Sequence, residues 1–97
     1  MVTKEQCLNG VKAVINCKKT SWNISVNSKQ NGLMCFPFEK GYSELNEKEL
    51  LPNVKITILS KPKRFNACGV QVKFLVEGDD TIMSAWWICF KHKVDLL

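Results

Sequence analysis

The stretch TIMSAWWICFKHK, from Thr81 to Lys93, decides the fold because it contains two adjacent tryptophans, Trp86 and Trp87. Its β-branched and aromatic residues predict a strand over residues 81–91. Neighbouring side chains in a strand point to opposite faces of the sheet. Only one of the two tryptophans can therefore enter the core, and that choice sets the orientation of every residue around it.

The preceding run, GVQVKFLVE over residues 69–77, predicts a strand whose even-numbered residues form the core face. A three-residue loop, 78–80, pairs even with even positions and puts Trp86 inside. A loop of two or four residues puts Trp87 inside instead, because a slip of one residue reverses the face. The even positions of 81–91 are the more hydrophobic, so we expect Trp86 in the core and Trp87 on the second face.

The N-terminal residues carry the signals of a helix. Thr3 and Gln6 are spaced as a capping box, and apolar residues follow at helical spacing, although Asn9 and Gly10 interrupt them. This pattern predicts an amphipathic helix from about Lys4 to Lys18. Further strands are expected at 21–27, 33–38 and 54–61, with a short helical turn near 46–51.

Short connections between these segments favour antiparallel pairing. The predicted fold is therefore α+β, with the N-terminal amphipathic helix packed on an antiparallel sheet of about five strands. The alternative is a small β-barrel of the oligonucleotide-binding type, whose five strands are also interrupted by a helix. The length of 97 residues fits a single domain, 1–97.

The cysteine pattern indicates a reducing environment. The five cysteines are odd in number and include no CxxC pair, and the N-terminal residues are polar rather than a secretory segment. We therefore expect free thiols and a cytoplasmic protein. No apolar run approaches the ~20 residues that cross a membrane, so no membrane partner is expected.

Positive charge is concentrated in one part of the chain. The net charge is +5, and residues 53–76 contain four lysines and one arginine without an acidic residue. The segment SKPKRFNACG places Lys61, Lys63 and Arg64 beside Phe65. Basic residues next to an aromatic ring suit phosphate contacts and base stacking, although an edge hairpin also uses lysines to prevent aggregation.

The second sheet face is expected to form the rest of the binding surface. In this interpretation an exposed Trp87 is surrounded by Lys55, Lys73 and Lys91, as a platform for an unstacked base. The alternative is that the N-terminal helix covers this face and buries Trp87.

Features of an active site are missing from the sequence. The one histidine, His92, lies between two lysines, and in a strand Cys89 and His92 would point to opposite faces. The glycines are scattered rather than grouped into a phosphate-binding loop. We therefore predict a protein that is not an enzyme and that has no metal or cofactor.

The expected function is that of a small basic binding protein that contacts single-stranded nucleic acid through the basic loop and the aromatic face. The alternative is a protein-interaction module, such as an inhibitor or adaptor of a mobile genetic element, that binds an acidic surface of a larger protein. Steep salt dependence of binding distinguishes the first from the second.

Overall fold

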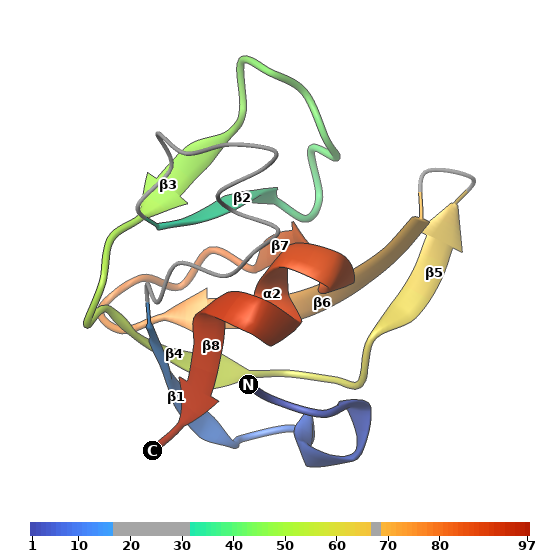
Figure 1. Ribbon diagram of the computed structural model, residues 1–97. Coiled ribbons are helices and arrows are strands. Elements are labelled where there is room, and N and C mark those ends of the chain that lie inside the picture. Colours follow the sequence, from blue (N-terminus) through green and yellow to red (C-terminus); the bar gives the residue numbers. More distant parts are fainter. Residues whose placement is uncertain (17–31, 67–68) are drawn as a thin grey trace.

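The computed structural model describes residues 1–16, 32–66 and 69–97, with the side chains of residues 65 and 66 excepted (Figure 1). Its sheet is a half-barrel, and the strand pairs are antiparallel in the order β3-β2-β7-β6-β4-β1-β8, with β5 paired to β6 beside this path. The elements are η1 (Lys4–Gln6), β1 (Lys12–Ile15), β2 (Leu33–Pro37), β3 (Lys48–Leu50), β4 (Lys55–Ile58), β5 (Lys63–Asn66), β6 (Gly69–Val76), β7 (Met83–Trp86), α2 (Trp87–Lys93) and β8 (Val94–Leu96).

Strand β6 organises the sheet because it pairs with three neighbours. It pairs with β7 between Gln71 and Phe74, with β5 near its start and with β4 near its end. Val72 and Phe74 are fully buried, whereas Lys73 and Leu75 between and beyond them are partly exposed. We name the side of the sheet that carries Val72 and Phe74 the inner face, and the opposite side the outer face.

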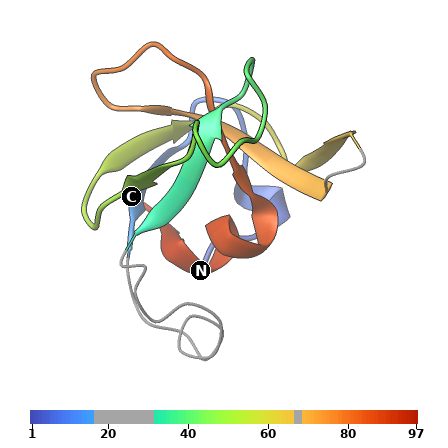
Figure 2. The same ribbon diagram turned by 90° about the horizontal axis from the view of Figure 1, so that it is seen from above.

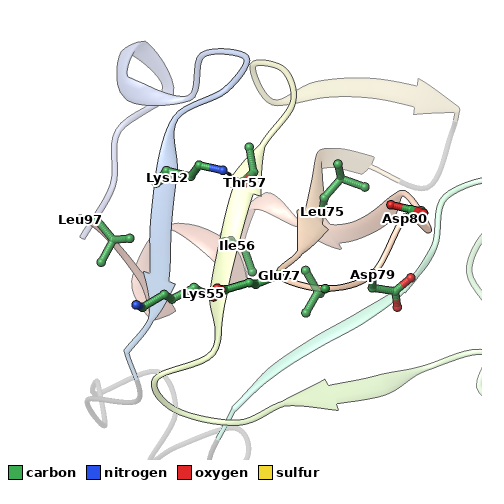
Figure 3. A pocket seen from close by; sticks show the side chains of 11 residues that line it. Lys12, Lys55, Ile56, Thr57, Leu75, Glu77, Asp79, Asp80 and Leu97 are labelled. Atoms are coloured by element: carbon green, nitrogen blue, oxygen red, sulfur yellow. Dashed lines mark hydrogen bonds between the residues drawn. The ribbon is translucent and has the colours of Figure 1, made fainter.

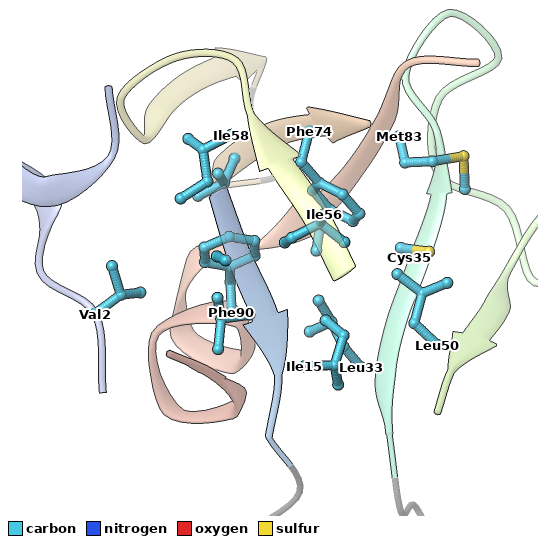
Figure 4. Packing of buried hydrophobic residues seen from close by; sticks show 14 of the residues in the cluster. Val2, Ile15, Leu33, Cys35, Leu50, Ile56, Ile58, Phe74, Met83 and Phe90 are labelled. Atoms are coloured by element: carbon cyan, nitrogen blue, oxygen red, sulfur yellow. The ribbon is translucent and has the colours of Figure 1, made fainter. Parts of the chain in front are cut away.

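Helix α2 lies against the sheet (Figure 2), and the hydrophobic core fills the space between this helix and the inner face (Figure 4). Helix α2 packs on the sheet through Trp87 and Phe90, and the ring centroids of Phe90 and Phe74 are 5.7 Å apart. Lys93 at the end of this helix is also buried, and its ammonium donates a hydrogen bond of 2.8 Å to the Gly32 carbonyl. The helix therefore covers part of the inner face of the sheet.

The predicted N-terminal helix over residues 4–18 is wrong. The interaction within the proposed capping box is present, since Thr3 N donates to Gln6 Oε1 at 2.9 Å, but it supports only the single turn of η1. Gly10 then takes a φ of 90° and donates to the Ile58 carbonyl at 2.8 Å, which starts the pairing of β1. Ala13 and Ile15 are buried at a spacing of two, so this apolar run follows the strand period.

The predicted orientation of the two tryptophans is also wrong. The connection between β6 and β7 covers residues 77–82, so odd positions of β7 pair with even positions of β6, as in Phe74 with Met83. Trp86 consequently lies on the outer face and is partly exposed. Trp87 begins α2, where the chain turns back over the inner face, and is 8% exposed.

The overall α+β prediction, a sheet of about five strands under an N-terminal helix, is thus wrong. The described residues form an antiparallel sheet of eight strands, and the helix that packs on it lies after β7. The strands predicted at 33–38, 54–61 and 69–77 are confirmed as β2, β4 and β6. Strand β3 lies where a helical turn is predicted, at 46–51. Strand β5 lies within the segment SKPKRFNACG, for which a loop is predicted, and the sequence analysis predicts no strand at the position of β8. The strand predicted at 21–27 lies outside the described residues. Within the described part, no helix is long and apolar enough to cross a membrane.

Burial of two cysteines is expected to lower the reactivity of their thiols. Cys7 and Cys35 are fully buried free thiols, and burial raises the pKa of each to about 11. The Glu5 carboxylate adds to the shift at Cys7, whereas Lys48 opposes it at Cys35. Only about one in a thousand of these thiols is ionised at pH 8, and the thiolate is the reactive form.

We therefore expect iodoacetamide at pH 8 to alkylate Cys7 and Cys35 far more slowly in the folded protein than in urea. Peptide mass spectrometry of quenched time points measures both rates. Equal rates in the two solvents would show that these thiols are accessible in the folded state.

Candidate functional site

The outer face carries a row of lysines from four strands. Lys73 is on the outer side of β6, and Lys63 of β5 lies opposite the outer residue Gln71. Thr57 pairs with both Leu75 and Lys12, which places Lys12 of β1 and Lys55 of β4 on the same side. We name Lys12, Lys55, Lys63 and Lys73 the lysine row. Regular alternation along each strand brings these charges together from distant parts of the sequence.

An aromatic cluster borders the lysine row. Trp86, Phe36 and Tyr42 pack in a triangle in which each pair of ring centroids is 5.6 Å apart. Phe36 is 2% exposed, Trp86 is partly exposed and Tyr42 is 47% exposed. The indole also lies beside Gly69, where an added Cβ would be 3.8 Å from it. The cluster therefore holds the Trp86 ring in one orientation and leaves part of it open to a ligand.

Polar contacts stabilise the surroundings of Trp86. The Ser84 hydroxyl and the Gln71 side-chain oxygen form a buried hydrogen bond of 2.7 Å beneath the outer surface. The Lys73 ammonium lies 4.9 Å from the centroid of the Phe38 ring, which is the geometry of a cation–π contact. A hydrogen bond to Glu47 raises the pKa of the Tyr42 phenol.

A groove of about 550 Å³ lies at the other end of the lysine row (Figure 3). Lys12 and Lys55 line it on the side of β1 and β4, and the Lys12 ammonium donates to the Thr57 hydroxyl at 2.9 Å. On the lysine side, the Glu77 amide donates to the Lys55 carbonyl at 3.0 Å. On the other side the groove is lined by Asp79 and Asp80 of the turn after β6. One of them, Asp79, accepts a hydrogen bond from the Thr81 amide, which lowers the pKa of its carboxyl.

The predicted site residues separate into two groups in the structure. Lys55, Lys63 and Lys73 come together in the lysine row, and Lys61 is exposed in the connection that leads to β5. Arg64 is exposed but pairs with Val70, so it leaves β5 on the side opposite Lys63. Phe65 belongs to β5, and its side chain is not among those described.

The remaining two predicted residues do not join this surface. Trp87 is buried against the inner face and cannot act as an exposed platform. Lys91 belongs to α2, which packs on the inner side of the sheet, and its carbonyl accepts a hydrogen bond from Val2 N at 3.2 Å.

The residues that the sequence reasoning missed are Trp86, its neighbours Phe36 and Tyr42, and Lys12. The sequence leaves either Trp86 or Trp87 for the outer face, and the length of the connection before β7 decides between them. Lys12 was assigned to a helix, although Ala13 and Ile15 alternate with it and with Val14 in the manner of a strand. The pairing of Tyr42 with Trp86 left no signal in the sequence, because it joins a loop to a distant strand.

Within residues 1–16, 32–66 and 69–97, no three His, Cys, Asp or Glu side chains gather so as to hold a metal ion. His92 lies on α2 and is partly buried. Comparison of the chain with protein-family models, with curated proteins and with solved structures found no match.

Proposed function

We propose that the outer face binds single-stranded nucleic acid. The observation that carries the proposal is the position of Trp86, whose partly exposed indole lies on the same face as Lys63 and Lys73. Lys63, Gln71 and Trp86 occupy matching positions on three adjacent strands. Single-strand binding proteins combine aromatic rings that stack on bases with cations that contact the phosphates, and this surface offers both groups.

The extent of the charged surface supports this proposal. Strands β4 and β5 pair with the same edge of β6, so across the sheet the lysine row covers the three positions of β6, β4 and β1. At about 4.8 Å between adjacent strands, this is roughly 10 Å. The row continues from the aromatic cluster to Lys12 and Lys55 across β6, β4 and β1. A flexible strand that stacks one base on Trp86 can therefore place neighbouring phosphates on several lysines.

Salt dependence tests the electrostatic part of the proposal. We expect replacement of Lys12, Lys55 and Lys63 by glutamine to weaken binding of a labelled oligothymidylate and to lower the slope of log K against log salt by roughly 2, since each phosphate contact on a single strand contributes about 0.7. Fluorescence anisotropy over a salt gradient gives the slope. A matched variant with Lys4, Lys40 and Lys48 replaced by glutamine has the same net charge and exposed substitution sites, and should retain most of the slope.

The contribution of stacking is tested separately. Trp86→Ala should weaken oligonucleotide binding by about 1–3 kcal/mol, the usual contribution of one stacked base, while the salt slope stays the same. If the two triple variants reduce the slope equally, the charge is diffuse and the outer face is not the binding site. If Trp86→Ala binds as tightly as the wild type, the indole is not a platform.

The second candidate is a protein-interaction module. Leu45 is 95% exposed and lies in the same loop as Tyr42, which packs on Trp86. Large exposed apolar residues beside Trp and Tyr are typical of protein interfaces, and the lysine row would then face an acidic partner. This function is favoured if the wild type binds no oligonucleotide at low salt but forms a discrete complex with an acidic protein on size exclusion.

A further inference from the structure

The groove at the end of β6 presents opposite charges on two sides of an apolar floor. Lys12 and Lys55 come from β1 and β4, whereas Asp79 and Asp80 come from the turn that follows β6 (Figure 3). Leu75, Val76 and Leu97 are among its apolar lining residues. Its volume of about 550 Å³ lies within the range of ligand pockets, about 300–1,000 Å³. Such a groove suits a flat ligand that is anionic at one end and donates hydrogen bonds at the other.

We propose that the groove accepts one nucleotide of the bound strand and prefers guanine. This inference rests on the proposed function and adds base selectivity to it. The phosphate would contact the Lys12 and Lys55 ammoniums, and the edge of the base would face the carboxylates of the turn. Both lysines belong to the lysine row, so the groove continues the surface on which Trp86 lies.

The carboxylates supply the selectivity because ionised oxygens only accept hydrogen bonds. Guanine presents two adjacent donors, its ring N–H and its amino group, which match the two oxygens of one carboxylate. Thymine presents a single N–H between two carbonyl oxygens, which the carboxylates repel. Adenine and cytosine each offer one amino group beside an acceptor nitrogen. The expected order of affinity is therefore guanine first, adenine and cytosine next, and thymine last.

The turn residues are suited to this role to different degrees. Asp79 accepts the Thr81 amide at Oδ1 at 2.9 Å and also a hydrogen bond from the Thr81 side chain, so its carboxylate is already engaged within the turn. The side chains of Glu77 and Asp80 are exposed and line the groove. Asp80 and Glu77 are the residues to change, because substitution of Asp79 would also alter the turn.

The test compares four oligothymidylates that carry dG, dA, dC or dT at one central position. With the wild type we expect the dG strand to bind about fivefold or more tightly than the all-dT strand, which is the lower end of discrimination by a bidentate contact. The double variant Glu77→Gln with Asp80→Asn should bring this ratio close to one. A control with Glu5→Gln and Glu44→Gln removes two exposed acidic charges elsewhere and should keep the ratio.

The outcomes separate this inference from the proposed function. If all four strands bind the wild type equally and Trp86→Ala weakens all of them, the outer face binds nucleic acid but the guanine preference is overturned. If the preference survives in the Glu77 and Asp80 double variant, the groove is not its source and the inference is again overturned. If no strand binds, both proposals fail together.

Discussion

Trp87→Ala should destabilise the fold by about 3–5 kcal/mol, the usual cost of removing a large aromatic side chain from a core. Trp87 is 8% exposed, and its ring stacks on Phe90 with centroids 6.2 Å apart at an interplanar angle of 30°. Because Trp87 and Phe90 carry α2 onto the sheet, the substitution removes packing from both layers. A loss of this size is a large fraction of the stability of a small domain.

Urea denaturation followed by circular dichroism measures the effect, with Trp86→Ala as the comparison. Trp86 is partly exposed and packs only at the outer face, so its removal should cost clearly less than removal of Trp87. A larger loss for Trp86→Ala than for Trp87→Ala would restore the orientation that the hydrophobic pattern alone favours and would contradict the register between β6 and β7.

Gly32→Ala should also be severely destabilising, for a different reason. A Cβ at this position would lie 2.0 Å from the Leu50 carbonyl oxygen and 2.8 Å from the carbonyl carbon, closer than real Cβ atoms approach. The backbone cannot move away freely, because the Gly32 carbonyl accepts the buried Lys93 ammonium at 2.8 Å. We expect a loss of about 3 kcal/mol, at the upper end of the usual cost of overpacking.

Gly78→Ala provides the control for this substitution. Gly78 has a φ of 84°, but nothing lies within 4 Å of its added Cβ, so only backbone strain of about 1–2 kcal/mol is expected. Thermal and urea unfolding of both variants give the comparison. If Gly32→Ala is as mild as Gly78→Ala, then β2 and β3 do not approach each other as closely as described.

The sequence predicted the elements whose hydrophobic pattern admits one interpretation. In β6, Val72 and Phe74 alternate with Gln71 and Lys73 over a long strand, and this alternation cannot be read as a helix. Lys55 in β4 follows the same pattern. For this reason the sequence reasoning correctly assigned Lys55 and Lys73 to the face that turns away from the core.

The errors arose where a local pattern admits two interpretations. Val11, Val14 and Ile15 fit a helix face, yet Gly10 begins a strand, and pairing with β4 overrides the helical spacing. In the segment after Trp86, β-branched and aromatic residues favour a strand, but burial of Trp87 and Phe90 over the inner face selects a helix. Tertiary packing decides whether such a segment forms a helix or a strand. Packing also sets the length of the connection after β6, and this length determines which tryptophan faces the core.

The partnership of β1 with β8 has a consequence for synthesis of the chain on the ribosome. Ala13 pairs with Leu96, so the two strands come from opposite ends of the described residues. Among the described strands, β1 has only β4 as a partner until β8 has emerged, and one of its edges stays exposed to other chains. Closing such a long loop also carries an entropic penalty and slows folding relative to proteins with local contacts. This edge of β1 is therefore expected to be among the last in the described sheet to be paired during translation.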